Sequence, residues 1–327
     1  MFRRFFLLSL FLAFAGSCWA ADSSCSSDLP VDIVGRAGGV VRNLKPADLV
    51  AVAGKNQDLK IESLTYDAGP RRILFVLDTV HDLPSDARKA EAKIVERILA
   101  SARPNDSFAL ITSRGTSRSA KFDQGLDALK QVVAELATDP KDKASAPGVL
   151  DAVMEGISWF GDPKPGDSVF LMAMNLENNH KTNVKKVAHE LETRHMRLFG
   201  LVLGPINLGN TAKTQTDNYG GKFSYAQASD LPDYRDQEFY PLVMNSGGFL
   251  YGDDALNEQR EYKLTDDRLQ RLQTMGLQFY QVMTEFYHLN VQLNSHTPWK
   301  LGISPGAQER ITGNTVVLYP RQIECGK

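Results

Sequence analysis

Two acids and a histidine stand close together where a strongly apolar stretch gives way to polar residues. Asp78, His81 and Asp82 follow the apolar residues 73–77. A carboxylate beside an imidazole can run general acid–base chemistry, and carboxylate oxygens are ligands that Mg²⁺ prefers. The segment therefore suits either a hydrolase with an Asp/His site or a binding site that holds a cation.

Other combinations that would indicate an enzyme fail on spacing. His189 and His195 are six residues apart, so a helix does not bring them to one face as a zinc protease requires. The glycines of residues 35–39 lie in a predicted hairpin, whereas a dinucleotide loop joins a strand to a helix. The sequence has no Gly-x-Ser-x-Gly motif, which argues against a serine hydrolase. We therefore expect no enzyme.

The elements that would position Asp78 alternate between strands and helices. Residues 73–77 are typical of a strand that is buried on both faces in a parallel sheet, and Ser85 can cap the helix that follows, at 85–102. Further buried strands are predicted at 107–112, 169–174 and 198–203, with a short one at 120–122 and an edge strand at 249–251. Helices are predicted at 126–136, 149–160, 184–194 and 238–244. This order predicts an α/β fold with a doubly wound, mainly parallel sheet, in which ligands bind at the carboxyl ends of the strands.

Both ends of the mature chain are predicted to be β-rich. Residues 21–29 indicate a flexible lead-in, and 204–236 a long polar loop. Strands are predicted at 31–34 and 39–41, joined as a hairpin, at 50–52 and 59–66, and, after a helix at 269–286, at 287–293, 299–303 and 316–319. We expect a β segment at 21–70, an α/β domain at 71–255, and a helix and β segment at 256–327 that packs with the first segment.

Residues 1–20 have the pattern of a secretory signal peptide. Two arginines near the start supply positive charge, residues 5–15 form the apolar core, and Ala20 ends the cleavage motif. The core is too short for an easy membrane span, so we expect an exported protein, periplasmic or extracellular, with no membrane span after cleavage. An uncleaved anchor and a lipid-modified Cys18 are the alternatives.

Cys25 and Cys325 remain at the two ends of the mature chain. Two cysteines in an oxidising compartment usually pair, so we expect a disulfide between them, with two free thiols as the alternative. The formal net charge is −2, which gives no basic field for nucleic acid.

Several segments together resemble a known family. Residues 71–78 look like the opening strand of a von Willebrand factor type A domain, and 44–48 like the turn that precedes it. Residues 245–250 resemble the family's Thr-Gly-Gly strand entry, and 280–293 its helix and returning strand. Over residues 31–323 the chain is most similar to secreted bacterial proteins with a VWFA-related domain.

This resemblance implies a divalent-ion site, the metal-ion-dependent adhesion site, at the top of the sheet. Asp78 matches the first residue of the family's Asp-x-Ser-x-Ser loop, but Val80 and Asp82 replace its serines. Pro147 lies near the family's Thr position, and Asn175 stands where an Asp is expected. We therefore expect a degenerate site without metal, and Mg²⁺ held by Asp78 and Asp82 is the alternative.

The resemblance also implies recognition rather than catalysis. We expect a non-catalytic binding or scaffold protein that meets a protein partner through the loops at the carboxyl end of the sheet. A secreted hydrolase with an Asp/His site is the alternative. The residues expected to line the binding face are Asp78, His81, Asp82, Asn175, Glu177 and Asn178.

Overall fold

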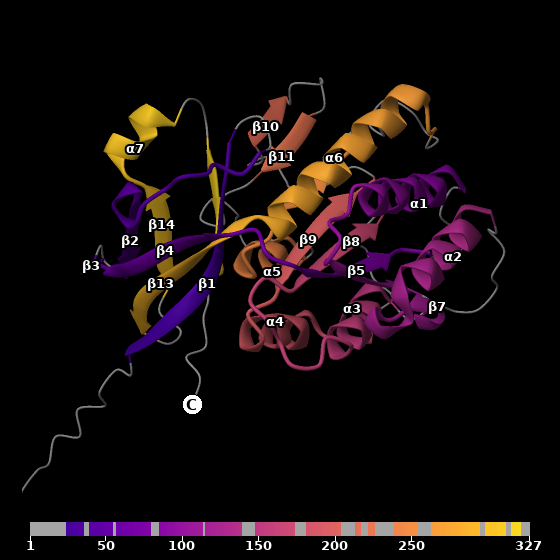
Figure 1. The fold of residues 1–327 in the computed structure, drawn as a ribbon, viewed down its shortest axis with the longest axis horizontal. Helices are drawn as coiled ribbons and strands as arrows, with labels where there is room; N and C mark the ends of the chain where they lie inside the picture. The colour runs from indigo at the N-terminus through magenta and orange to yellow at the C-terminus, as the bar shows by residue number, and fades with distance from the viewer. Residues whose placement is uncertain are drawn as a thin grey trace, which may run out of the picture.

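A six-stranded sheet forms the centre of the larger part of the molecule (Figure 1). Its strand order is β12-β9-β8-β5-β6-β7, and all neighbours pair in parallel except β6 and β7. The strands are β5 (Arg72–Leu77), β6 (Ser107–Thr112), β7 (Gly115–Ala120), β8 (Ser168–Ala173), β9 (Arg197–Val202) and β12 (Leu250–Gly252). The computed structural model describes residues 24–35, 39–54, 57–79, 85–113, 115–138, 148–173, 181–203, 213–216, 222–225, 239–253, 263–294, 298–311 and 315–321.

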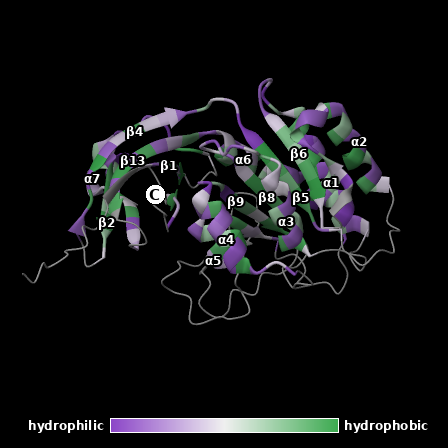
Figure 2. Ribbon diagram, turned by 90° about the horizontal axis from the view of Figure 1, so that it is seen from below, coloured by the Kyte–Doolittle hydropathy of each residue, from purple (hydrophilic) through white to green (hydrophobic). Residues whose placement is uncertain are grey.

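β5 lies inside the sheet because both of its faces are apolar. Ile73, Phe75 and Leu77 belong to the hydrophobic core on one side, and Leu74 and Val76 to the core on the other. All five are buried, and each such side chain contributes about 2 kcal/mol when it leaves water. A sheet edge or a solvated face would forfeit much of that, so the sequence of β5 fixes its central position. The hydrophobic colour in Figure 2 is accordingly strong on β5 and β6.

Helices cover both faces of this sheet. The core on the Phe75 side includes residues of α1 (Ser85–Ala100), α2 (Gly125–Thr138) and α6 (Asp266–Thr284), and the opposite core includes residues of α3 (Val149–Ser158), α4 (Val184–Thr193) and α5 (Phe239–Asn245). None of the helices in the described ranges is long and apolar enough to cross a membrane. The layers are therefore helix, sheet and helix.

The predicted α/β fold with a doubly wound, mainly parallel sheet is confirmed. The strand predicted at 107–112 coincides with β6, and β5, β8 and β9 begin one residue earlier than predicted. The short strand predicted at 120–122 is wrong, because β7 ends at Ala120 and Phe122 begins the 3-10 helix η2 (Phe122–Gln124). The segment Gly-Thr-Ser-Arg-Ser-Ala of β7 carries almost no apolar signal.

Strands from the two ends of the chain form a smaller unit, here called the β module. One sheet has the order β15-β1-β13-β4 and the other the order β14-β2-β3. The two share an apolar core of their own. The strands are β1 (Ser24–Val34), β2 (Leu49–Ala53), β3 (Gln57–Asp58), β4 (Ile61–Asp67), β13 (Phe286–Asn294), β14 (Trp299–Ile303) and β15 (Val316–Leu318), with the 3-10 helix η1 (Pro46–Asp48) and helix α7 (Pro305–Arg310) beside them.

Two local predictions are wrong in this and the neighbouring segments. The flexible lead-in at 21–29 is contradicted from Ser24 onward, because β1 begins there and pairs with β13. The long polar loop at 204–236 contains a hairpin of β10 (Lys213–Thr216) and β11 (Lys222–Tyr225). The residues at the start of β1 and those of β10 and β11 are mostly polar, so no apolar pattern indicated these strands.

The hairpin predicted between 31–34 and 39–41 is present in a short form. Val34 and Val40 form an antiparallel bridge. The N–H of Val41 donates to the carbonyl of Ile33 at 2.7 Å, and the N–H of Gly35 donates to the carbonyl of Gly39 at 2.9 Å.

A buried ion pair joins the β module to the six-stranded sheet. Arg197 at the start of β9 donates from Nη1 to Oδ2 of Asp32 on β1, and both side chains are 0% exposed. Nη2 of Arg197 donates to the carbonyl of Met283 at 3.1 Å, and the guanidinium lies 4.5 Å from the ring centroid of Phe286. Burial raises the pKa of Asp32 to about 7, although Arg197 and Arg71 oppose the rise.

Gly248 shows how closely the chain is packed where it enters β12. A Cβ atom at this position would lie 1.7 Å from the carbonyl oxygen of Leu198 and 2.6 Å from its carbon. Backbone atoms of a central strand have no room to move aside. We therefore expect Gly248→Ala to lower the free energy of unfolding by about 3 kcal/mol or more, measured by urea denaturation. Gly306→Ala, where nothing lies within 4 Å, is the control and should cost nothing; equal effects of the two would contradict this account.

Candidate functional site

The carboxyl ends of β5, β6, β8, β9 and β12 meet at one edge of the six-stranded sheet, here called the carboxyl edge. From β5 the sheet continues to β6 on one side and to β8 on the other. The strand order therefore reverses direction between β5 and β8, which makes this the topological switch point. Open α/β sheets bind ligands in the crevice outside such a point. Asp78 is the first residue after β5, so it lies where a ligand is expected.

Asp78 is held by hydrogen bonds to its own protein. Its backbone N–H donates to the carbonyl of Met172 at 2.9 Å, which extends the pairing of β5 with β8. The hydroxyl of Ser113 donates to Oδ1 of Asp78 at 3.1 Å, and the same hydroxyl accepts the N–H of Thr79 at 2.9 Å. Asp78 is 4% exposed. The carboxylate thereby ties the residues after β5 to those after β6.

A second carboxyl group lies under this part of the edge. Glu91 projects from the inner side of α1 and is 1% exposed. Burial raises the pKa of Glu91 well above its ordinary value, the nearby charge of Asp78 raises it further, and Arg88 opposes both. Glu91 therefore keeps its proton to a higher pH than an exposed glutamate does, which limits the negative charge beside Asp78.

Asp151 near the start of α3 performs a similar task on the other side of the switch point. Its Oδ1 accepts the N–H and the hydroxyl of Thr182, at 2.8 and 2.5 Å, and its Oδ2 accepts the N–H groups of Gly148 and Lys181, at 3.1 and 2.9 Å. Burial alone would raise the pKa of Asp151, but these donors lower it. One carboxylate thus fixes the residues that precede α3 to those that precede α4.

The structure describes only part of the predicted binding face. Asp78 is present at the switch point, as described above. The other predicted residues follow β5 and β8 in the chain, and they lie outside the described residues: His81, Asp82, Asn175, Glu177 and Asn178. Cys325 also lies outside them, and of Cys25 only the backbone is described, opposite Leu293 in β13.

Sequence reasoning missed Ser113, Glu91 and Asp151. Asp151 stands three residues after Gly148 at the start of a helix, a spacing typical of an acid that accepts backbone N–H groups at a helix start. The sequence pattern could therefore have indicated the role of Asp151. No nearby pattern indicates the roles of Ser113 and Glu91, because only the folded sheet brings them to Asp78.

The residues of the carboxyl edge that are described do not make a metal site. A divalent cation needs several oxygen ligands from converging groups, and the described residues contain no group of three His, Cys, Asp or Glu side chains that could hold a metal. Oδ1 of Asp78 accepts a hydrogen bond from Ser113. The alternative of Mg²⁺ at Asp78 and Asp82 depends on a residue outside the described ranges and stays a prediction.

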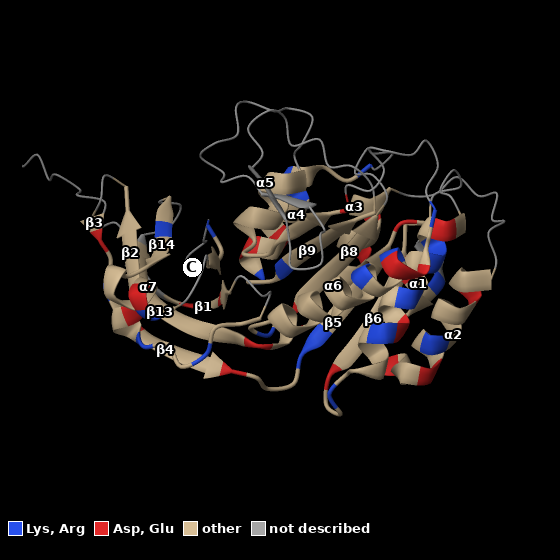
Figure 3. Cartoon of the chain, turned by 90° about the horizontal axis from the view of Figure 1, so that it is seen from above, with Lys and Arg blue, Asp and Glu red and all other residues tan. Residues whose placement is uncertain are grey.

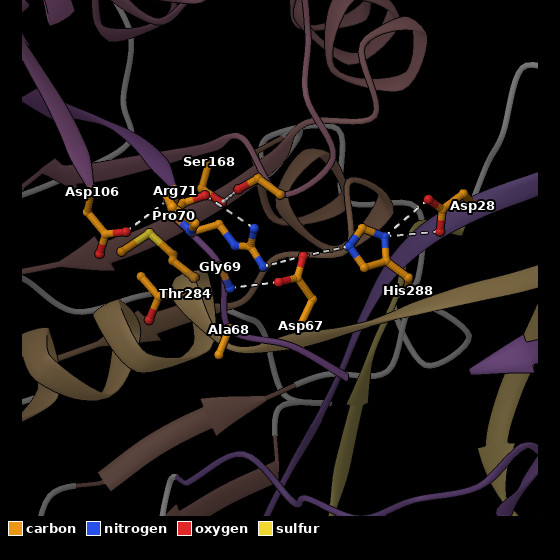
Figure 4. Close-up of polar contacts among 12 residues, drawn as sticks. Asp28, Asp67, Ala68, Gly69, Pro70, Arg71, Asp106, Ser168, Thr284 and His288 are labelled. Carbon is orange, nitrogen blue, oxygen red and sulfur yellow. Dashed lines mark hydrogen bonds and ion pairs between the residues drawn. The ribbon is translucent and has the colours of Figure 1, made fainter. Parts of the chain in front are cut away.

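A second polar cluster lies at the junction of β4 with β5. The ring of His288 lies between two acids, with Nδ1 3.1 Å from both carboxylate oxygens of Asp28 and Nε2 2.8 Å from Oδ2 of Asp67 (Figure 4). Asp67 also accepts the N–H of Gly69 at 2.6 Å and pairs with Arg71 at 2.8 Å. Burial alone would raise the pKa of Asp67, but these partners lower it to about 2. The cluster joins β1, β13 and β4 to the chain that enters β5.

Comparisons with known proteins give only distant similarities. No known family profile and no curated protein sequence matches the chain. Among solved structures it is similar to BatB, a conserved hypothetical protein of Bacteroides thetaiotaomicron, at 12% identity and a TM-score of 0.38, covering 65% of this chain and 98% of that one. It is also similar to proximal thread matrix protein 1 of the mussel byssus, with a zinc-occupied MIDAS motif, at 12% identity and a TM-score of 0.41, covering 70% of this chain and 50% of that one. Similarities this distant assign no family, and the fold described above rests on the chain's own strand order.

The Asp151 hydrogen bonds give a first prediction for this site. Asp151→Asn replaces one acceptor oxygen by an amide nitrogen, which would face N–H donors. We expect the free energy of unfolding to fall by about 1–2 kcal/mol, measured by urea denaturation, with faster exchange of the Lys181 and Thr182 amides. The control is Asp123→Asn, an exposed acid at η2, which should change neither. A variant at 151 that behaved like the control would show that the carboxylate does not hold these residues.

The Asp67 cluster gives a second prediction, on pH. The pKa of Asp67 is lower in the folded protein than in the unfolded chain, so its contribution to stability is present above about pH 4 and is lost as the pH falls towards 2. The shift corresponds to roughly 2 kcal/mol after a reduction for partial solvent exposure. Between about pH 5 and pH 2.5 roughly two thirds of that contribution is lost, so Asp67→Asn should lose roughly 1 kcal/mol less stability than the wild type. Asp58→Asn, at an exposed site on β3, should follow the wild type. If the free energy of unfolding changes with pH in the same way in all three proteins, the assignment to Asp67 is contradicted.

Proposed function

We propose that this is an exported, non-catalytic binding or scaffold protein whose protein partner meets the carboxyl edge. The observation that carries the proposal is that two acids at this edge, Asp78 and Asp151, accept hydrogen bonds from the protein itself. Asp78 accepts from Ser113, and Asp151 accepts from four donors on three residues. Carboxylates that hold the chain in place at the switch point give a surface of fixed shape. This arrangement suits recognition of a partner better than proton transfer to a substrate.

The proposed contact residues follow the two strands that flank the switch point. His81 and Asp82 come after β5, and Asn175, Glu177 and Asn178 come after β8. Their side chains offer hydrogen-bond donors, acceptors and charge, which give specificity at the rim of a protein interface. The resemblance to von Willebrand factor type A domains, drawn from the sequence, supports the same role.

The charge distribution supports a protein partner rather than a nucleic acid. Acidic and basic side chains are interspersed along α1 and α2 (Figure 3), and the formal net charge is only −2. Nucleic-acid binding normally relies on a concentrated basic surface. We propose a protein partner for this reason.

Export and a terminal disulfide are part of the same proposal. The pattern of residues 1–20 supports cleavage after Ala20, and export would place Cys25 and Cys325 in an oxidising compartment. Mass spectrometry of the mature protein tests both points. An N-terminus at Ala21 and a Cys25–Cys325 peptide that disappears on reduction are the expected results, while an N-terminal lipid on Cys18 would contradict the cleavage.

The binding role is tested with photo-crosslinking residues in the full exported chain. Placed at Asp82 or Asn178, the crosslinker should join the protein to one defined partner in the source cells. Placed at Lys300, an exposed residue of β14 in the β module, it should not. The double variant Asp82→Ala, Asn178→Ala should then weaken binding of the purified partner about tenfold or more, and Lys300→Ala should leave it unchanged.

Two results would contradict the proposal. Partner binding that is unaffected by the double variant would move the interface away from the carboxyl edge. Hydrolysis of an ester, phosphate or glycoside that disappears with Asp82→Ala would make the protein an enzyme.

A further inference from the structure

The β module contains a hollow that is separate from the carboxyl edge. It has a volume of about 410 Å³ and lies between the chain that follows β1 and the end of α7. Its lining combines the apolar side chains of Val41, Leu44 and Ile311 with the charged side chains of Arg42 and Arg310. A volume of this size, apolar surface and a few polar groups are the usual properties of a small-molecule site.

Arg42 is anchored on one side of its guanidinium. Nε and Nη2 both donate to Oε2 of Glu285, at 3.1 and 2.6 Å, and Nε also lies 3.1 Å from the hydroxyl of Tyr66. That hydroxyl donates to the same Glu285 oxygen at 2.6 Å. Nη1 of Arg42 makes no hydrogen bond to any residue that the structure describes, and the side chain is 55% exposed. The two N–H donors on Nη1 of a positioned arginine are therefore left for a ligand.

Arg310, which also lines the hollow, is held in the same manner. Its Nη2 donates to Oδ1 of Asp48, and its Nε to the carbonyl of Gly306 at 3.4 Å. Asp48 is itself fixed, because its Oδ2 accepts the N–H of Lys45 at 2.9 Å. Nη1 of Arg310 likewise has no partner within the described residues, and the side chain is 62% exposed. Carboxylates that orient a guanidinium reduce the conformational freedom it loses when it binds an anion.

We propose that this hollow binds an organic carboxylate, with the acid group at Arg42 and Arg310 and the apolar body against Val41, Leu44 and Ile311. Guanidinium groups match the planar shape of a carboxylate. Two arginines and two acids leave the cluster without net charge, so a ligand with a single negative charge is favoured over a phosphate dianion. The site lies in the β module, so it does not depend on the function proposed for the carboxyl edge.

The test is an NMR titration of the mature protein with four probes. Hexanoate carries both the acid and the apolar body, acetate only the acid, 1-hexanol only the body, and hexyl phosphate a larger charge. We expect hexanoate to shift the amide signals of Val41, Asn43, Leu44 and Ile311 with a Kd of about 1 mM. The other three probes should bind with a Kd at least about tenfold higher. Equal binding of acetate would remove the apolar part of the proposal, and stronger binding of hexyl phosphate would overturn the preference for a carboxylate.

Variants then test the two arginines. The double variant Arg42→Gln, Arg310→Gln should weaken hexanoate binding about tenfold or more, and the single Lys variants, which keep the charge but lose the planar group, should fall between. Arg194→Gln is the matched control, because Arg194 also pairs with an acid, Glu190 at 3.1 Å, but is the C-cap residue of α4 in the α/β part of the molecule. It should bind hexanoate like the wild type. The proposal fails if the variants at 42 and 310 bind as the control does, and the Lys variants decide the matter if the double variant does not fold.

Discussion

The contact between Asp32 and Arg197 is the constraint on which the arrangement of the two units depends. Both side chains are completely buried. An unpaired charge in the protein interior costs several kcal/mol. Each is acceptable only because the other is present, and they come from different units, β1 and β9. The six-stranded sheet and the β module can therefore bury their common surface in one relative position, with the pair in register.

Aromatic stacking extends this constraint beyond one ion pair. The ring of Phe286 lies 4.5 Å from the guanidinium of Arg197 and 4.2 Å from that of Arg71, distances at which the ring face attracts a cation. Phe286 begins β13 one residue beyond the C-cap of α6, and Arg71 directly precedes β5. The two chain crossings between the units thus meet at one ring. The carboxyl edge lies at the opposite ends of β5 and β9, whose starts carry Arg71 and Arg197, so a fixed junction also fixes the direction in which that edge faces.

The sequence was most informative where the local pattern and the final environment agree. Residues 73–77 are apolar throughout, and β5 is buried on both faces; hence the fold and the position of Asp78 could both be predicted. It was least informative where distant residues supply the order. The start of β1 is Ser-rich and has no strand pattern of its own. It forms a strand because it pairs with β13, near the other end of the chain. Ser113 reaches Asp78 only through the pairing of β5 with β6, and no spacing in the sequence records that.

The origin of the β module has a consequence for how the protein is made. Its strand β1 lies between β13 and β15, and Asp28 meets His288 across a separation of 260 residues. The six-stranded sheet, by contrast, is assembled from strands that follow one another in the middle of the chain. A polypeptide emerging from a ribosome or a translocation channel can form the central sheet early, whereas β1 must wait for the last part of the chain. A chain that lacked β13 and β15 would leave β1 with open edges, and such edges recruit other chains. Completion of the β module therefore depends on synthesis of the chain through β15.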